Sequence, residues 1–153
     1  GGLVAMPHAG ELLGAESVDR TVRALHPVRI GHGVRAVEDP QVLDLLAERG
    51  IACEVCPASN VALGVVGDHA DVPLRRFADA GVPVVLAADD PLLFGASLVE
   101  QYVVARGALG HSRAELAHLA RTSIDVSTMP DSVARMVRAD IDAWEDDEPA
   151  AVS

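Results

Sequence analysis

Four short apolar runs, each followed by a polar cluster and then by a helical pattern, constrain the fold of this chain most strongly. The polar clusters occupy residues 6–11 (MPHAGE), 29–33 (RIGHG), 54–60 (EVCPASN) and 87–91 (AADDP). Strands and helices that alternate at this pace indicate βαβ units and a parallel sheet. Because a β/α-barrel builds its active site from groups at the carboxyl ends of successive strands, the four clusters predict one shared site.

The expected elements follow from apolar spacing and from the residues that begin and end helices. Asp39 and Pro40 suit the first positions of a helix, and Gly50 suits the residue that ends it. Ser112 and Glu115 have the spacing of a capping box. Strands are expected at residues 3–6, 28–30, 51–55 and 82–87, with a loop at 56–72. Helices are expected at residues 17–25, 40–49, 73–80, 97–108, 112–122 and 130–144.

The composition limits the classes of partner. Half of the 153 residues are hydrophobic but only 3% are aromatic, so the core must consist of Ala, Val and Leu. The formal net charge is −11 and the few Arg residues are dispersed, which argues against a nucleic-acid partner. No signal peptide or membrane-spanning stretch is present, so a cytoplasmic protein without a membrane partner is expected. The expected organisation is one domain at residues 1–144 and an acidic flexible tail at 145–153.

The two cysteines have the spacing of a redox or zinc-binding pair. Cys53 lies inside an expected strand, whereas a redox pair usually opens a helix, and a zinc ribbon needs a second pair that the sequence lacks. Two unpaired, reduced thiols are therefore expected. Cys56 has the chemistry of a nucleophile but no evident activating neighbour, so the segment 56–60 is expected to shape the wall of a pocket.

Two of the clusters contain histidine. His8 is followed closely by Glu11, so one turn offers an imidazole that can bind zinc and a carboxyl group that can act as a general acid when shielded from water. The alternative is a surface turn. His32 lies between Gly31 and Gly33, which leave its ring accessible, and the alternative there is a structural histidine in a tight turn. The other histidines are expected on the solvent side or in packing: His26, His69, His111 and His118.

Asp89 and Asp90 follow the most apolar of the expected strands. Adjacent carboxylates at the end of a buried strand repel each other and lose solvation, and a bound cation relieves both penalties. Carboxylate oxygen is a suitable zinc ligand. The alternative is that both residues cap the helix that begins near Pro91.

Taken together, the motifs resemble one family. HAGE at residues 8–11, GHG at 31–33, CPxSN at 56–60 and DDP at 89–91, in this order, are similar to the carboxyl-terminal half of the adenosine deaminase family. Bacterial members are also similar at GHGVRAVEDP, residues 31–40. The resemblance extends from residue 3 to about residue 144. It implies an α/β fold, the carboxyl-terminal half of a (β/α)8 TIM barrel with about four parallel strands, followed by terminal helices.

The resemblance also implies roles for individual residues in the hydrolytic deamination of adenosine or a related 6-aminopurine. His8 and Asp89 are expected to bind one zinc ion per active site, and Asp89 also to contact the attacking water. Glu11 is expected to protonate a purine ring nitrogen, and His32 to orient and help deprotonate the water.

Two further residues are expected to bind the substrate. The resemblance implies that the Gly10 backbone N–H holds a second ring nitrogen and that Asp90 bonds the imidazole edge of the purine. Ribose contacts usually come from upstream loops of the family, so adenine and aminodeoxyfutalosine are alternative substrates.

The chain departs from the family pattern in two places. Ala87 and Ala88 stand where polar residues usually precede the two aspartates, and loss of such supporting partners weakens metal affinity about 10–100-fold. No His-x-His is present, although the family takes two further zinc ligands from that motif. The start at Gly1 and Gly2 predicts a piece of a longer protein, which needs an amino-terminal half-barrel or self-association to cover two sheet edges. The alternative function is a truncated, inactive domain that acts by assembly or is a remnant.

Overall fold

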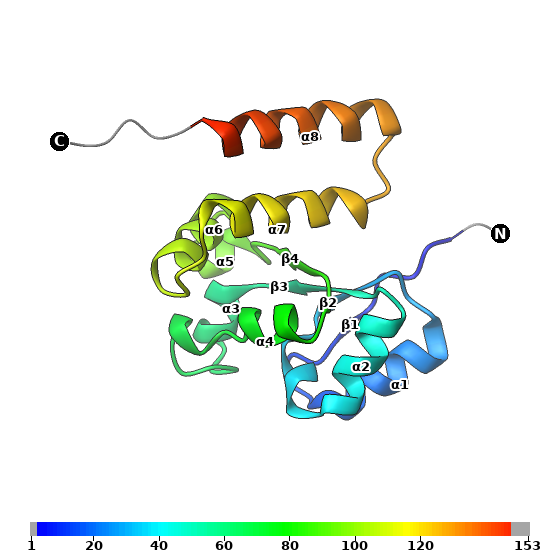
Figure 1. Ribbon diagram of the computed structural model, residues 1–153. Helices are drawn as coiled ribbons and strands as arrows, with labels where there is room; N and C mark the ends of the chain where they lie inside the picture. The colour runs from blue at the N-terminus through cyan, green and yellow to red at the C-terminus, as the bar shows by residue number, and fades with distance from the viewer. Residues whose placement is uncertain (1–2, 148–153) are drawn as a thin grey trace.

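Four parallel strands form the centre of the molecule. The computed structural model describes residues 3–147, and within them the strand order is β1-β2-β3-β4 with every neighbouring pair parallel (Figure 1). The strands are β1 (His8–Ala9), β2 (Arg29–His32), β3 (Ala52–Val55) and β4 (Val84–Leu86). The predicted parallel sheet of about four strands is therefore confirmed.

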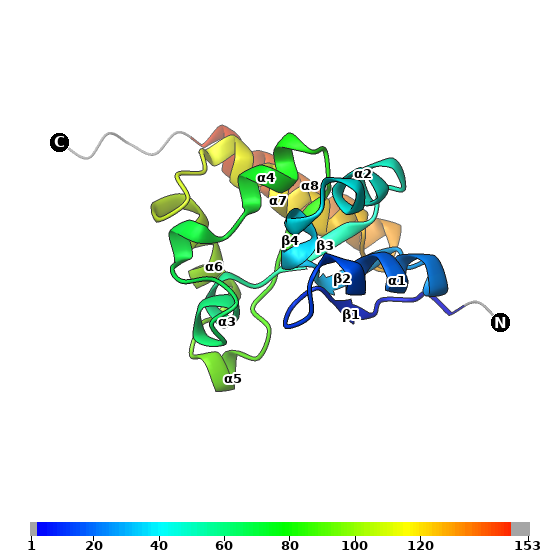
Figure 2. The ribbon, with the colours of Figure 1, turned by 90° about the horizontal axis from the view of Figure 1, so that it is seen from below.

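Helices connect the strands and continue after the last one (Figure 1 and Figure 2). The connecting elements are α1 (Ala15–Leu25), η1 (Val34–Glu38), α2 (Pro40–Glu48), α3 (Pro57–Ala62), η2 (His69–Asp71) and α4 (Leu74–Asp79). The elements after β4 are α5 (Pro91–Phe94), α6 (Leu98–Gly107), α7 (Arg113–Asp125) and α8 (Asp131–Asp146). Helix α7 lies between the sheet and α8, so α8 forms an outer layer (Figure 1). In the described part of the chain, no helix is both long and apolar enough to cross a membrane.

Local signals in the sequence explain where α2 begins and ends. Asp39 accepts a hydrogen bond from the Gln41 backbone N–H at 2.9 Å, and Pro40 occupies the first turn, where its missing N–H costs nothing. Gly50 has a φ of +61°, which glycine adopts without strain, and it directs the chain back toward β3. The predicted start of this helix at Pro40 is confirmed, and the helix ends at Glu48, one residue before the predicted Arg49.

The strands alternate their side chains between two faces. Ile30, Cys53 and Val84 are in register and nearly fully buried, and they belong to the core beneath the helices. The neighbouring row runs from Gly31 to Glu54 across β2 and β3. This second row carries the polar groups, so one face of the sheet packs in the hydrophobic core and the other face is polar.

Several predicted boundaries differ from the structure. The strand predicted at 3–6 is wrong, because β1 is His8–Ala9. Leu3 is 99% exposed, and this run bonds to the segment before β2 only through the Ala5 carbonyl, which accepts from Val28 N–H at 3.2 Å. The loop predicted at 56–72 contains α3 and η2.

The carboxyl-terminal helices are longer than predicted. Helix α7 continues to Asp125 and α8 to Asp146, so the first two residues of the predicted tail at 145–153 are helical. Residues 148–153 lie outside the described residues. The last helix therefore extends two residues beyond the predicted boundary at residue 144.

The capping box of α7 leads to a prediction about acid stability. The Ser112 backbone N–H donates to Glu115 and lowers the pKa of that carboxyl to about 2. Since the unfolded value is near 4.5, this stabilisation is present above pH 4.5 and is lost as the pH falls toward 2. Glu115→Ala should lower the melting temperature at pH 7, and the gap from wild type should narrow progressively below pH 4.5. The exposed Glu48, replaced in the same way, should show no such pH-dependent gap in thermal unfolding.

Candidate active site

A cavity of about 210 Å³ lies at the carboxyl ends of the strands and draws on all four polar clusters. Its lining consists of His8, Gly31, His32, Glu54, Cys56, Ala87, Ala88 and Asp89. Each strand contributes through its last residues or through the connection that follows it. The two residues predicted to bind metal, His8 and Asp89, therefore line the same cavity.

The His8 ring depends on a glycine in the neighbouring strand. A Cβ atom built on Gly31 would lie 2.9 Å from His8 Cδ2, which is closer than real Cβ contacts. The absence of a side chain at Gly31 therefore leaves the space that the His8 imidazole occupies. The ring centroids of His8 and His32 are 5.3 Å apart, so both imidazoles share this part of the cavity.

Two residues of the cavity have left-handed backbone conformations. The φ angle is +64° at His32 and +58° at Asp89, a region that costs roughly 1–2 kcal/mol for an L-residue. Strand alternation would place His32 on the same face as Ile30, which is buried under the helices. The left-handed turn breaks that alternation, and the ring lines the cavity instead. Backbone strain of this kind concentrates at functional sites.

Glu11 lies against His32. His32 Nε2 is 3.6 Å from Glu11 Oε2, and the side chains are 4% and 24% exposed. This distance is too long for a hydrogen bond but fits an ion pair when the histidine is protonated. The Nδ1 atom of His32 is buried and has no hydrogen-bond partner among the described residues. The pair thus combines a carboxyl group with an imidazole that still has one nitrogen available.

The two predicted substrate-binding residues have other partners. Asp90 Oδ1 accepts from the Leu92 and Leu93 backbone N–H groups at 3.0 and 3.1 Å, so Asp90 caps α5, and it does not line the cavity. The Gly10 N–H donates to Ser17 Oγ at 3.0 Å. Both substrate-binding roles stay predictions, and the role of Gly10 requires that this bond be exchanged for one to the ligand.

Sequence analysis missed an ion pair on the polar face of the sheet. Arg29 Nε lies 2.7 Å from Glu54 Oε1, although its N–H is not directed at that oxygen, so the contact is electrostatic rather than a hydrogen bond. Arg29 Nη1 also donates to the Val126 carbonyl at 2.8 Å. The sequence signal for this pair was the presence of a charged residue, Arg29 or Glu54, in each of two otherwise apolar strands. Because Glu54 lines the cavity, this pair holds a carboxylate near the site.

Both thiols are buried and free, as predicted. Burial raises the pKa of Cys53 and of Cys56 to about 12, and nearby carboxylates add to the effect, Asp89 among them at Cys56. At pH 8 the thiolate fraction falls about 1,000-fold below that of an ordinary cysteine. Ellman's reagent should therefore detect no fast-reacting thiol in the folded chain and two after denaturation. Rapid labelling of either thiol without denaturant would contradict this assignment.

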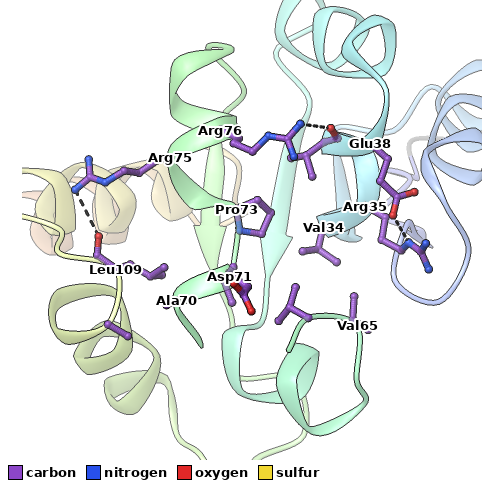
Figure 3. Close-up of a pocket in the computed structure, with 14 residues that line it drawn as sticks. Val34, Arg35, Glu38, Val65, Ala70, Asp71, Pro73, Arg75, Arg76 and Leu109 are labelled. Carbon is purple, nitrogen blue, oxygen red and sulfur yellow. Dashed lines mark hydrogen bonds and ion pairs between the residues drawn. The ribbon is translucent and has the colours of Figure 1, made fainter. Parts of the chain in front are cut away.

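A second cavity, of about 390 Å³, lies away from these groups (Figure 3). It is bounded by η1, by the segment before α4 and by the end of α6. Its three arginines already have partners: Arg35 donates to Glu38, Arg75 contacts Glu115 and the carbonyls of Leu109 and Gly110, and Arg76 donates to the Val37 carbonyl. Because their guanidinium groups already contact other protein groups, this cavity offers fewer free polar groups to a ligand than the smaller cavity does.

The remaining histidines do not line the site cavity. His111 is buried, with Nδ1 3.2 Å from the Ala105 carbonyl, which confirms a packing role for it. His26 ends α1 in a left-handed conformation, and its backbone N–H donates to the Val22 carbonyl. Thus His26 and His111 have structural roles, whereas His8 and His32 line the cavity.

Solved structures place this fold in a larger architecture. An adenine deaminase from Arthrobacter aurescens matches 93% of this chain with a TM-score of 0.88 and 33% identity. An amidohydrolase from Burkholderia ambifaria, crystallised with bound Zn, matches 94% with a TM-score of 0.82 and 26% identity. Arabidopsis ADAL complexed with GMP matches 92% with a TM-score of 0.80 and 26% identity. The chain is thus part of an amidohydrolase-type β/α-barrel, and it covers 41–43% of these three chains.

Sequence comparison identifies the family. The adenosine deaminase family model matches residues 1–144, and the chain belongs to the adenosine deaminase family. It is 56% identical over 144 residues to a Streptomyces virginiae protein named "Putative adenosine/adenine deaminase". It is 46% identical over 138 residues to an adenine deaminase of Rhizobium leguminosarum bv. trifolii. These matches cover 94% and 90% of this chain but only 42% and 43% of the relatives, so the chain spans about two fifths of their length.

Proposed function

We propose that this chain supplies the carboxyl-terminal part of an active site that hydrolytically deaminates a 6-aminopurine, adenine or adenosine. The observation that carries the proposal is the single cavity that gathers His8, His32 and Asp89, with Glu11 against His32. The names of the two relatives, adenosine/adenine deaminase and adenine deaminase, support the choice of substrate class.

The donor groups fit zinc. His8 offers an imidazole and Asp89 a carboxylate, which are common zinc ligands, and both residues line the same cavity. We assign His8 and Asp89 as the zinc ligands of this chain. A catalytic zinc usually has three protein ligands, so the other ligands must come from a segment that the longer relatives contain. A zinc ion bound there lowers the pKa of a water molecule to roughly 7.

The chain's own residues then handle the protons. His32 receives a proton from the water as its oxygen bonds to the amino-bearing carbon of the purine. Glu11, in its protonated form, gives its proton to the adjacent ring nitrogen, which makes that carbon electrophilic. The amino nitrogen takes the proton held by His32 as its bond to carbon breaks, and the remaining proton of the added oxygen passes to the Glu11 carboxylate, so the products are ammonia and the 6-oxopurine. Asp89 orients the water in addition to its part in metal binding.

A chimera tests the proposal. Residues 1–144 of this chain would replace the matching segment of the Streptomyces virginiae relative, and ammonia release would be followed from adenine, adenosine and aminodeoxyfutalosine. We expect zinc-dependent turnover of adenine or adenosine. A chimera that folds and binds zinc but releases no ammonia from any aminopurine would refute the proposal.

The open edges of the sheet support the need for a partner. Within the described residues, β1 and β4 each pair on one side only, and beside β1 the side chains of Leu12 and Leu13 are 65% and 66% exposed. An amino-terminal half-barrel could cover these open edges and exposed side chains. A second copy of the chain could also cover them, as the alternative of an inactive domain that acts by assembly requires. Gel filtration of the chain alone distinguishes the two, because a stable oligomer without zinc favours the alternative.

A further inference from the structure

An apolar groove with a volume of about 490 Å³ lies between α6, α7 and α8. Its walls carry side chains of α6 and α8, namely Leu98, Val99, Tyr102, Val137, Ile141 and Trp144, and α7 forms its floor. Within residues 3–147, this α6–α8 groove shares no lining residue with the active-site cavity. None of the roles proposed for the deaminase reaction uses it.

The apolar side chains of the groove are incompletely covered. Val99 is 71% exposed, Leu98 49% and Trp144 43%. Lone exposed apolar residues are ordinary on protein surfaces, but a contiguous apolar patch around a concave groove marks a contact site. The groove therefore indicates a surface that another element covers.

Helix α8 adds a second observation, because none of its residues is buried. It lies alongside α7 (Figure 1) and is attached to it by ion pairs of Arg121 with Asp142 and of Arg138 with Asp125, none of which lines the groove. Ion pairs at a surface contribute little to stability. These contacts fix where α8 lies, while the apolar side that it turns to the groove needs another element to cover it.

The groove lies on one flank of α7, and α4 occupies the other flank. Glu115 and Leu119 line a cavity that α7 shares with α4. Ala117 and Ile124 line the groove instead, and a helix with 3.6 residues per turn directs these two pairs to different sides. Strand β4, beneath α7, pairs with β3 and has a free edge on its other side within the described residues. Because α4 connects β3 to β4, the groove lies toward that free edge.

The barrel architecture of the solved relatives indicates which element comes next. In such a barrel each strand is followed by a helix of the outer ring, and the connection is right-handed. The strand that pairs with the free edge of β4 is therefore followed by a helix beside α7, on the flank away from α4. This chain covers only 41–43% of the solved relatives, so that helix belongs to the remainder.

The charge of the groove specifies the chemistry of its occupant. Asp140 is the single charged residue among those that line it, and it is exposed. Asp142 on the same helix is paired with Arg121, whereas Asp140 has no ion-pair partner in the described part of the chain. A second copy of this chain is a poor occupant, because it would bring its own net charge of −11 to an acidic rim.

We propose that the α6–α8 groove binds an amphipathic helix from the part of the barrel that this chain does not match in its longer relatives. The apolar stripe of that helix covers Val99, Ile141 and Trp144, and a lysine or arginine on it pairs with Asp140. Burial of these side chains joins α8 to the barrel. The inference rests on the fold of the family and not on the proposed chemistry, so the two can fail separately.

One substitution in two proteins tests the proposal without any assay of deamination. In the isolated chain Val99→Glu changes an exposed side chain, so the melting temperature should shift by less than about 2 °C. In the chimera with the Streptomyces virginiae relative, the same glutamate would be buried without a partner, and the melting temperature should fall by at least about 5 °C. Thermal unfolding followed by circular dichroism measures both shifts.

Met136→Glu is the matched control for this substitution. Met136 lies on α8, is 60% exposed and does not line the groove. It should shift the melting temperature by less than about 2 °C in the isolated chain and in the chimera alike.

A charge reversal tests the chemistry of the occupant. Asp140→Lys should lower the melting temperature of the chimera by about 2–4 °C at low ionic strength, and the effect should shrink in 1 M salt because salt screens the repulsion. The isolated chain should show no such salt-dependent loss. Asp44→Lys, an equal change of charge at an exposed position of α2, is the control and should leave the melting temperature of both proteins unchanged within about 2 °C.

Three results would overturn the inference. The first is a Val99→Glu effect that is no larger in the chimera than in the isolated chain. The second is a dimer of the isolated chain, seen by analytical ultracentrifugation, that Val99→Glu dissociates, since a second copy would then be the occupant. The third is a chimera that does not fold, which leaves the deaminase proposal open. A chimera that meets these expectations but releases no ammonia refutes the proposed function and leaves this inference intact.

Discussion

Glu11→Gln in the chimera is expected to lower kcat by about 10²–10⁴-fold while KM changes less than 10-fold, because glutamine keeps the shape of the side chain but has no proton to give to the purine ring. The structure places this carboxyl against a nearly buried imidazole, with Oε2 3.6 Å from His32 Nε2. Steady-state kinetics with adenine and adenosine would measure the split between kcat and KM. A loss confined to KM would show that Glu11 only binds the substrate.

Glu16→Gln is the matched control for this substitution. Glu16 lies five residues further along on α1, its side chain is 82% exposed, and its contact with Arg20 is a 3.6 Å surface ion pair. Surface pairs of this kind contribute little to stability. The control should keep kcat and KM within a factor of two. An equal loss of kcat in both variants would indicate a general effect of removing negative charge rather than proton transfer at Glu11.

The positions of these groups could be predicted from the sequence only in part. Strands β2, β3 and β4 and helix α2 were predictable because apolar runs and local signals such as Asp39 and Gly50 agree with the final packing. The convergence of the four clusters followed from the rule that parallel strands end at one edge of the sheet. Strand β1 was misplaced, since the apolar run 3–6 does not reveal that its backbone makes a single hydrogen bond to the segment before β2, through the Ala5 carbonyl.

The details of the site depend on backbone conformations that residue types do not specify. Neither histidine nor aspartate requires a positive φ, so the turns at His32 and Asp89 that bring both side chains to the cavity arise from tertiary context. The hydrogen bond from Gly10 to Ser17 likewise joins the turn to the following helix in a way that spacing alone does not reveal. The sequence contains one signal for helix α3, because Pro57 suits the first turn of a helix. The polar residues around it favoured the prediction of a loop instead.

Gly10→Ala is expected to destabilise the chain by about 2–5 kcal/mol. Gly10 has a φ of +67°, and a Cβ atom there would lie 2.4 Å from Val18 Cγ2 on α1. Two costs therefore add: a left-handed alanine costs roughly 1–2 kcal/mol, and overpacking of the core costs about 1–3 kcal/mol. Urea unfolding of the full chain, followed by circular dichroism, would measure the sum.

Two further variants separate the costs. Gly50→Ala has a similar φ of +61° but nothing within 4 Å of its Cβ, so it should lose only the backbone cost of roughly 1–2 kcal/mol. In a Val18→Ala background the 2.4 Å clash is removed and a tight 3.2 Å contact with the Gly33 Cα atom remains, so Gly10→Ala should cost less than in the wild type but still somewhat more than Gly50→Ala. If Gly10→Ala is equally costly with and without the Val18 side chain, the contact between α1 and the turn at Gly10 does not set the conformation of that turn. If the cost falls as expected, α1 packs directly against the backbone that holds Glu11 in place. The stability of the fold and the position of the proposed acid then both depend on the lack of a side chain at Gly10.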